Sequence, residues 1–306
     1  MTGRRRSRHP TPALATFSPV AVGLIGAGEM GSALGARLRD GGATVVVALD
    51  GRSERSRRRA TEAGLDDVGS LEALLAASEI VLSVVPPGAA REVALEVAAH
   101  PVASGRLFAE LNAIAPAGVA ELADTLAAAG VATVDGSISG PPPQRPGTTT
   151  VYLSGPRAQE VAALPLEGVE RRVVGERVGL ASAVKMCTAS VYKGRVAVLA
   201  QALRTAHAHG VLEPVLDDLA ETGMVDPARA GTTLGRASAK AWRYVAEMDE
   251  IAATQAAAGL PPELFAAFGE VYAELAEVAV AAAPEDVPDG EPLPEVLARL
   301  GRRAAR

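Results

Sequence analysis

The sequence predicts an α/β domain with a parallel sheet followed by an all-helical domain, and three observations support this. In the first half of the chain, short apolar runs rich in β-branched residues alternate with Ala/Leu/Glu/Arg stretches of helical period, a pattern typical of strand–helix–strand units. A glycine-rich turn follows the first of these runs. From about residue 178 the β-branched runs disappear and long helical stretches take over.

Each expected strand is a β-branched run, and the helices lie between them. We expect strands at residues 20–25, 44–49, 80–85, 107–111, 131–134, 149–153 and 172–174, and helices at 32–39, 71–77, 89–99 and 118–129. Later helical stretches cover residues 178–207, 214–222, 234–258, 262–282 and 294–305, with prolines at the breaks. The predicted domains therefore span residues 20–177 and 178–306.

Composition narrows the class of protein. The chain has 306 residues, of which 48% are hydrophobic and only 3% aromatic, so we expect a large aliphatic core. A net charge of −6 argues against a nucleic-acid-binding protein. The single cysteine, Cys187, excludes an internal disulfide framework and fits a cytoplasmic protein. No run is long and apolar enough to predict a membrane span.

The first 19 residues are rich in arginine and proline. The stretch after the arginines is too polar to be the apolar part of a secretory signal. We expect a disordered basic tail, with a targeting or anion-binding arm as the alternative.

The glycine-rich turn has the spacing Gly26-x-Gly28-x-x-Gly31 between an expected strand and an expected helix. Gly26 permits a tight turn, Gly28 lets the backbone approach a pyrophosphate, and Gly31 lets the helix pack closely on the strand. The start of that helix, at Glu29 and Met30, offers free N–H groups to an anion. The motif predicts a Rossmann-type dinucleotide site, and a simple glycine-rich turn is the alternative.

Two signals about the cofactor compete after the second strand. Asp50 lies about 20 residues beyond the glycines, where an acidic residue binds the ribose hydroxyls of NAD. The segment that follows carries Arg52, Ser53 and further arginines, which suit the extra phosphate of NADP. Asp50 as a turn residue and the arginines as a solvated helical turn stay open. We expect NADP to be preferred over NAD.

Three more residues lie at the expected carboxyl ends of strands, where open α/β sheets bind ligands. Val85 and Pro86 are expected to contact the adenosine ribose through their backbone. Asn112 is expected to touch the nicotinamide or the substrate, with a turn-forming asparagine as the alternative.

Four blocks in order resemble the β-hydroxyacid dehydrogenase family, which includes 6-phosphogluconate and 3-hydroxyisobutyrate dehydrogenases. They read GLIGAGEMG at 23–31, ELNAIAP at 110–116, DGSISGP at 135–141 and GERVGLASAVK at 175–185. Residues 237–248 resemble a phosphogluconate-dehydrogenase-like branch. The resemblance implies an NAD(P)-dependent oxidoreductase with Lys185 as the catalytic residue. Together with the amphipathic helices, it implies a homodimer formed by the helical domain, which also binds substrate.

The third block suggests how a carboxylate is bound. Ser137, Ser139 and Gly140 can supply hydroxyl and backbone donors, although a plain Ser/Gly/Pro loop is the alternative. The family has a second glycine where this chain has Pro141, which cannot donate an N–H. Thr188 stands where the family has an asparagine that contacts substrate. We therefore expect the acid group to be bound differently here.

Lys185 is the expected proton donor and acceptor. Its free pKa of about 10.4 is too high for a base at neutral pH, and burial would lower it. Ser182, Lys185, Ala189 and Tyr192 follow a 3-4-3 spacing and so share one helix face. We expect this face to line a cleft, and an ordinary exposed lysine is the alternative.

A second charged stripe comprises Lys240, Arg243, Glu247 and Glu250. A solvated face with salt bridges is the preferred interpretation, and contact of Lys240 or Arg243 with an anionic substrate is the alternative. His207 and His209 fit a helix end better than a metal site. No cluster has metal-ligand spacing, so we expect no metal.

These residues predict an NADP-preferring oxidoreductase that transfers a hydride between the nicotinamide and a small, anionic hydroxy acid or its keto or aldehyde form. An imine reductase of the same architecture is one alternative. Known imine reductases commonly have Asp or Tyr in place of the lysine, so Lys185 argues against it and Tyr192 for it. A non-catalytic NADP-binding dimer, suggested by Thr188 and Pro141, is the other.

Overall fold

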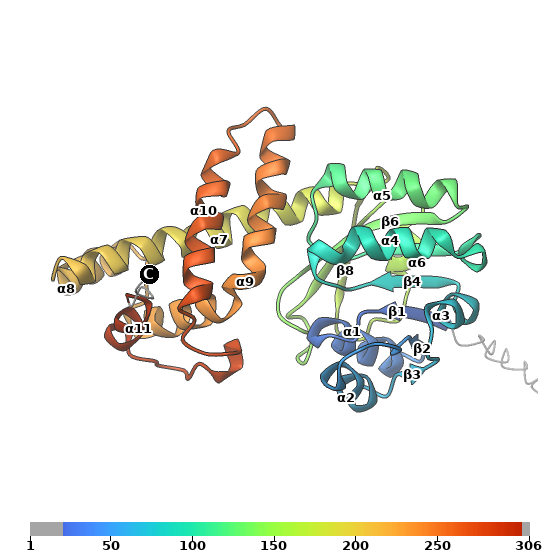
Figure 1. Ribbon diagram of the computed structural model, residues 1–306, viewed down its shortest axis with the longest axis horizontal. Coiled ribbons are helices and arrows are strands. Elements are labelled where there is room, and N and C mark those ends of the chain that lie inside the picture. The colour runs from blue at the N-terminus through green and yellow to red at the C-terminus, as the bar shows by residue number, and fades with distance from the viewer. Residues whose placement is uncertain (1–20, 302–306) are drawn as a thin grey trace, which may run out of the picture.

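The computed structural model describes residues 21–301, so the predicted basic tail lies outside the described residues. Within them one sheet of eight strands has the order β3-β2-β1-β4-β5-β6-β7-β8 (Figure 1). The strands are β1 (Ala21–Ile25), β2 (Thr44–Val47), β3 (Asp66–Asp67), β4 (Ile80–Ser83), β5 (Leu107–Glu110), β6 (Ala132–Ser139), β7 (Thr150–Ser154) and β8 (Glu170–Gly175). All neighbouring pairs are parallel except β6 and β7, which are antiparallel.

Helices cover both faces of this sheet. They are α1 (Glu29–Asp40), α2 (Glu54–Glu62), α3 (Leu71–Ala77), α4 (Ala90–Ala99), α5 (Pro116–Ala128) and α6 (Ala158–Ala162), with short 3-10 turns η1 (Pro87–Ala89) and η2 (Pro101–Ala103). Along β5, Leu107 and Ala109 join the apolar core shared with α1 and α6, whereas Phe108 joins the core under α3, α4 and α5. This alternation buries the strand on both sides, as parallel sheets require.

The second half of the described chain is helical. It comprises α7 (Leu180–Ala208), α8 (Leu212–Glu221), α9 (Pro227–Ala257), α10 (Glu263–Glu277), η3 (Pro284–Asp286) and α11 (Leu293–Leu300). Figure 1 shows α7 leaving the sheet and running through the helical region, where α9 and α10 pack against it. Met186, Leu203, Leu234, Met248 and Tyr272 are buried in the core they share. The predicted fold class, a Rossmann-like α/β domain followed by helices, is confirmed.

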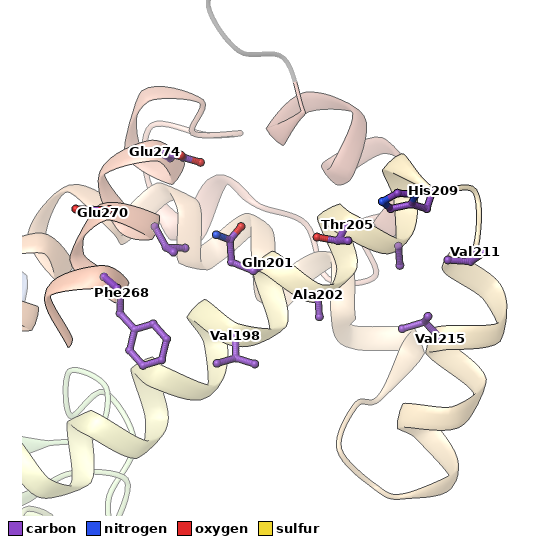
Figure 2. A pocket seen from close by; sticks show the side chains of 13 residues that line it. Val198, Gln201, Ala202, Thr205, His209, Val211, Val215, Phe268, Glu270 and Glu274 are labelled. Atoms are coloured by element: carbon purple, nitrogen blue, oxygen red, sulfur yellow. The ribbon is translucent and has the colours of Figure 1, made fainter. Parts of the chain in front are cut away.

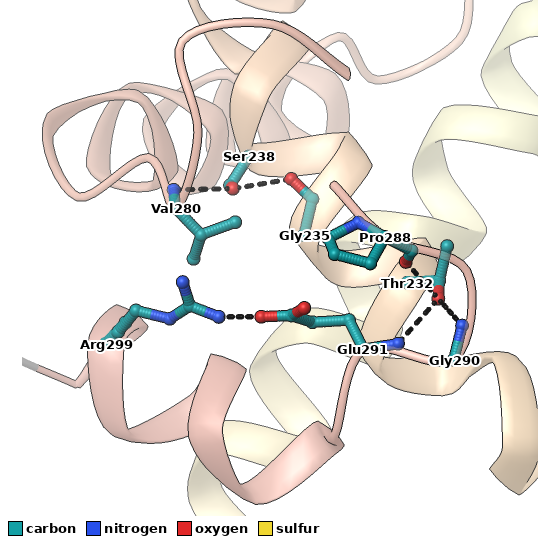
Figure 3. Close-up of polar contacts among 8 residues, drawn as sticks. All are labelled: Thr232, Gly235, Ser238, Val280, Pro288, Gly290, Glu291 and Arg299. Atoms are coloured by element: carbon teal, nitrogen blue, oxygen red, sulfur yellow. Dashed lines mark hydrogen bonds and ion pairs between the residues drawn. The ribbon is translucent and has the colours of Figure 1, made fainter. Parts of the chain in front are cut away.

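The segment after α10 returns along α9 and is pinned to it by two small polar side chains (Figure 3). Thr232 Oγ1 donates to the Pro288 carbonyl and accepts from the backbone N–H groups of Gly290 and Glu291. Ser238 Oγ accepts from the N–H of Val280. The segment is irregular, so its backbone N–H and C=O groups lack regular partners. These bonds with α9 supply partners for some of them.

Several elements differ from the sequence-based expectations. β6 continues to Ser139 instead of ending at residue 134, because Ser137 and its neighbours pair with β7. A loop interpretation of Ser137 and Ser139 is therefore wrong. The short strand β3 and the helix α6 were not predicted, and α9 begins at Pro227, earlier than expected. The arginines after Arg52 form α2, which the sequence offered only as the alternative of a solvated helical turn. The predicted division at residues 177 and 178 falls in the turn between β8 and α7.

Among residues 21–301, no helix combines the length and apolarity that crossing a membrane requires.

Candidate cofactor and active site

The glycine-rich turn joins β1 to α1, and two of its glycines are required by close backbone packing. Gly26 has φ +101°, and a Cβ there would collide with the carbonyl oxygen of Val84 at the end of β4. A Cβ on Gly31 would collide with the carbonyl oxygen of Gly26. Both positions therefore need glycine whether or not a ligand binds.

Gly28 differs from its two neighbours in the motif. A Cβ built on it meets nothing within 4 Å, so the space beside its backbone is open. It caps α1 without any side-chain hydrogen bond, which leaves the first N–H groups of the helix directed into that space. Exposed Glu29 flanks this opening, and Met30 packs partly into the sheet core. Open space beside free N–H groups fits a dinucleotide pyrophosphate.

The end of β2 carries the residues expected to select the cofactor. Asp50 and Arg52 are exposed, and Arg52 makes no ion pair within the described part of the chain. Ser53 is the N-cap of α2, and its Oγ accepts from the Ser56 N–H at 3.3 Å. Arg55 lies 3.6 Å from Glu285 of η3. The helical region thus reaches the site where an adenosine phosphate would bind.

Asn112 braces the carboxyl ends of β4 and β5. Its Oδ1 accepts from the Val85 N–H at 2.7 Å, and its Nδ2 donates to Ser83 Oγ at 3.1 Å. Its own N–H donates to Glu110 Oε1 at 2.9 Å. The structure therefore places Asn112 beside Val85 and the exposed Pro86, and its side-chain amide ties the two strand ends together.

Glu110 is a buried carboxyl group directly behind Asn112. Burial raises its pKa to about 7, although hydrogen bonds from Asn112 and Ser83 act in the opposite direction. Its Oε2 has no hydrogen-bond partner among the described residues. Across the sheet, Glu110 is paired in register with Asp135 of β6, whose charge also raises the pKa of Glu110.

Asp135 anchors the start of α7. Its Oδ2 accepts from the N–H groups of Gly179 and Ser182 at 2.9 and 3.1 Å and from Ser154 Oγ at 2.8 Å. Its Oδ1 accepts from Ser182 Oγ at 2.7 Å, and beside it Ser137 Oγ donates to the Ala181 carbonyl at 2.9 Å. Both predicted substrate hydroxyls, on Ser137 and Ser182, thus have internal partners that join α7 to β6.

Lys185 lies one turn further along α7. Its Nζ donates to the carbonyl oxygen of Ile138 at 2.7 Å, which places the amine beside Ser139 and Gly140. Burial, followed by the nearby charges of Lys193 and Arg243, lowers the pKa of Lys185 to about 8. Near neutral pH, such an amine exchanges its proton far more readily than an exposed lysine.

The other members of the predicted stripe on α7 do not share this environment. Thr188 Oγ1 donates back to the Val184 carbonyl at 2.9 Å. Ala189 is buried, whereas Tyr192 is 68% exposed on the outer side of the helix. Spacing alone predicted a shared face, but the core of the helical region covers that face only in part.

The charged stripe on α9 is only in part the solvated face with salt bridges that the sequence predicted, since Arg243 is exposed but Glu247 is buried. Glu250 Oε2 accepts from the Ala115 N–H before α5 at 2.6 Å. Glu247 is buried and forms an ion pair with Lys193 of α7. Burial lowers the pKa of Lys240, and the negative charge of nearby Glu29 acts in the opposite direction. The stripe faces α7 and the sheet domain, which no local pattern in the sequence indicates.

Comparison with known proteins decides the family. Residues 21–166 match the model of the NAD binding domain of 6-phosphogluconate dehydrogenase. A solved conserved protein of unknown function, described as structurally similar to 3-hydroxyacid dehydrogenases, is 30% identical, with 84% of this chain and 97% of that chain covered at a TM-score of 0.65. The chain belongs to the 6-phosphogluconate dehydrogenase-like β-hydroxyacid dehydrogenases. The resemblance predicted from four sequence blocks is thereby confirmed.

A curated relative and a second family model also match the chain of this β-hydroxyacid dehydrogenase family member. An uncharacterised 28.5 kDa protein of Methanothermus fervidus is 27% identical over 201 residues, which are 66% of this chain and 76% of that protein. Residues 206–275 match a second model, a domain of unknown function. The N-terminal domain is a nicotinamide-dinucleotide-binding domain, and the family consists of NAD(P)-dependent oxidoreductases.

Two further structures share the fold of the family at lower identity. The 3-hydroxyisobutyrate dehydrogenase of Mycobacterium tuberculosis is 18% identical at a TM-score of 0.66, covering 93% of this chain and all of that one. The reductive aminase of Aspergillus terreus, solved with NADPH, is 19% identical at a TM-score of 0.56, covering 92% and 99%. One fold therefore serves both alcohol and imine chemistry, so the site must distinguish them.

Within the described residues, no group of three or more His, Cys, Asp or Glu side chains is placed to bind a metal ion.

Proposed function

We propose that this chain is an NADP-preferring oxidoreductase that transfers a hydride between the nicotinamide and a small hydroxy acid, or its keto or aldehyde form. The observation that carries the proposal is the partly buried amine of Lys185, which donates to the Ile138 carbonyl beside Ser139 and Gly140. These groups lie near the carboxyl edge of the sheet that also holds the glycine motif. Open α/β sheets bind their ligands at this edge.

Lys185 has the environment that proton transfer requires. The bound nicotinamide would supply or accept the hydride. With a pKa of about 8, the amine can take the alcohol proton during oxidation and return a proton to the oxygen during reduction. Ser139 and the N–H of Gly140 are the donors proposed for the substrate carboxylate, and Thr188 would border the same space.

The preference for NADP rests on the end of β2. Arg52 is exposed and unpaired within the described residues, and Ser53 begins the helix whose N–H groups point toward the same place. A 2′-phosphate would gain charge-assisted hydrogen bonds there. In a thermal-shift titration we expect NADPH to stabilise the protein more than NADH. Arg52→Ala should remove most of that difference, and an unchanged difference would reject this preference.

An imine reductase is supported only by the shared fold. Its candidate residue, Tyr192, is 68% exposed on α7, whereas Lys185 is partly buried against β6. The experiment that decides is NADPH oxidation or NADP reduction across a panel of small hydroxy acids, keto acids, aldehydes and cyclic imines. Turnover confined to imines would reject the hydroxy-acid proposal. Cofactor binding without any turnover would favour the non-catalytic dimer.

The proposed homodimer would use the outer surface of the helical region. A groove of about 810 Å³ lies there between α7, α8 and α10 (Figure 2). Val198, Val211, Val215, Phe268 and Val271 supply most of its apolar lining. The groove lies well along α7 from Lys185, and its apolar side chains are bordered by Gln201, Thr205, His209, Glu270 and Glu274. Exposed apolar surface of this kind is typical of a protein–protein contact, and we propose a second copy of this chain as its occupant.

A further inference from the structure

A strap of the helical region, residues 280–291, carries the short turn η3 between two anchored ends. At one end the N–H of Val280 donates to Ser238 Oγ of α9 at 3.2 Å (Figure 3). Beyond η3, Val287 is 2% exposed and packs so closely on α9 that a Cβ on Gly235 would meet its Cγ1 at 2.9 Å. Both acidic residues of η3 are exposed. Helix α9 thus fixes the strap on either side and leaves its acidic tip at the surface.

This tip reaches the sheet domain. Glu285 Oε1 lies 3.6 Å from Nη2 of Arg55 in the first turn of α2, and the two side chains are 54% and 58% exposed. Burial and neighbouring arginines lower the pKa of Lys240 on α9, whereas the anions of Glu29, the first residue of α1, and Glu285 act in the opposite direction. Since α1 and α2 follow β1 and β2 directly, the tip of the strap lies at the carboxyl edge of the sheet.

Arg55 belongs to the segment where the proposed function places the 2′-phosphate of NADP. It follows Ser53, the N-cap of α2, by two positions. In Rossmann-type folds the adenosine ribose lies at the end of this second strand, and a guanidinium gives a phosphate there charge-assisted hydrogen bonds. In the structure, the carboxylate of Glu285 already pairs with one of the cations that such a phosphate needs.

We propose that Glu285 is a specificity-determining residue for the cofactor: its carboxylate pairs with Arg55 in the free protein, and the 2′-phosphate of NADP binds Arg55 in its place. Exposed ion pairs are weak, so a phosphate can displace the carboxylate without unfolding the strap. NAD has no phosphate at this position, so Arg55 stays with Glu285. The strap therefore lowers the affinity for NADP and leaves that for NAD unchanged. This inference rests on the proposed function, because it places the ribose of the cofactor at the end of β2.

The test measures NADPH and NADH binding to the full-length protein by isothermal titration calorimetry. In Glu285→Gln, NADPH loses its competitor for Arg55, so we expect its affinity to rise about three- to fivefold, while that of NADH changes by less than about twofold. Asp286→Asn removes the same net charge from the neighbouring exposed position and is the matched control, with both affinities close to those of wild type. A strap that only stabilised the fold would affect both nucleotides alike.

A second background separates competition for Arg55 from a long-range effect of charge. In Arg55→Met, NADPH should bind more weakly, and adding Glu285→Gln should no longer improve its binding, because the residue for which carboxylate and phosphate compete is absent. Arg55→Lys keeps a cation and should keep the response. The fragments 2′,5′-ADP and 5′-AMP carry only the adenosine end and should reproduce the contrast between NADPH and NADH. A gain that persists in Arg55→Met, a gain equal for both nucleotides, or no gain would overturn the proposal.

Failure of this inference and failure of the proposed function give different results. Wild type that binds NADPH and turns over a substrate, without any response to Glu285→Gln, rejects the inference and leaves the dehydrogenase standing. The expected binding pattern without turnover on any substrate rejects the hydride transfer and leaves Glu285 as a determinant of nucleotide specificity. Wild type that binds neither nucleotide rejects both.

Discussion

The two halves of helix α7 belong to different kinds of surface. In the first half, Asp135 and Ser137 of β6 bind the start of the helix through a network of hydrogen bonds, and Lys185 is held against the sheet domain. In the second half, Val198 is exposed and the helix borders a largely apolar groove. The same helix thus holds the amine of Lys185 against the sheet domain and exposes apolar side chains to solvent. We expect the polar half to position the proposed proton donor and the apolar half to form the proposed dimer contact.

Removing the amine of Lys185 should have the largest effect, and it tests the proposed role of the first half of α7 in proton transfer. We expect Lys185→Ala to lower kcat on the best substrate by about 10²- to 10⁴-fold, because the proton then has no donor or acceptor. The affinity for NADPH, measured by fluorescence titration, should stay close to that of wild type. An unchanged kcat would show that the amine takes no part in the reaction.

A second variant tests the hydrogen bonds by which Asp135 holds the start of α7, without changing Lys185. In Asp135→Asn, one oxygen that accepts from Gly179, Ser182 and Ser154 is exchanged for an uncharged or donating group. We expect the free energy of unfolding in urea to fall by about 2–4 kcal/mol. Asp217→Asn, at an exposed position on α8, is the matched control and should change it little. A loss no larger than that of the control would mean that Asp135 does not anchor α7.

The apolar half is tested by placing a charge on it. Val198→Asp would put a carboxylate into the proposed contact, and its desolvation would cost several kcal/mol if a second copy covers it. We expect light scattering to give a dimer for wild type and a monomer for the variant. Val174→Asp, which alters an exposed valine on β8, should leave the mass unchanged. A monomeric wild type would contradict the proposed dimer.

Glu110 provides the smallest and most specific test. Since burial raises its pKa from 4.5 to about 7, the folded state keeps a proton that the unfolded chain has already lost. Stability from this group is therefore present below pH 4.5 and is lost as the pH rises toward 7. Between pH 5 and 8, wild type should lose on the order of 2 kcal/mol relative to Glu110→Gln in urea unfolding. Parallel pH dependences would show that Glu110 titrates normally.

Prediction from sequence worked best where the signal is local. The glycine turn is recognisable because its three glycines lie within six residues, and close backbone packing requires two of them, Gly26 and Gly31. The strand and helix around them follow from periodicity. β6 was predicted too short because Gly136 and Ser137 have low strand propensity, and pairing with β7 overrides it. The arginines after Arg52 form a helix that the sequence offered only as an alternative.

Residues of the candidate site were also recognised from the sequence where the signal is local. Lys185 was identified through its block of glycines, and the structure brings it to Ser139 and Gly140. Ser137 and Ser182 were expected to contact substrate because they are donors of the right type. Their partners, the Ala181 carbonyl and Asp135, could not be foreseen, since Asp135 and Ser182 lie 47 positions apart in the chain.

The sequence by itself determined most of the succession of elements, the dinucleotide turn and the place of Lys185 after its glycine block, since these depend on residues that are neighbours in the chain. Only the tertiary structure decided the charge around that lysine. Lys193 was overlooked, and Glu247 was assigned to a solvated face, although 54 positions separate two groups that pair in space. Burial and Coulomb interactions depend on distance through the fold, and a linear pattern does not contain that distance.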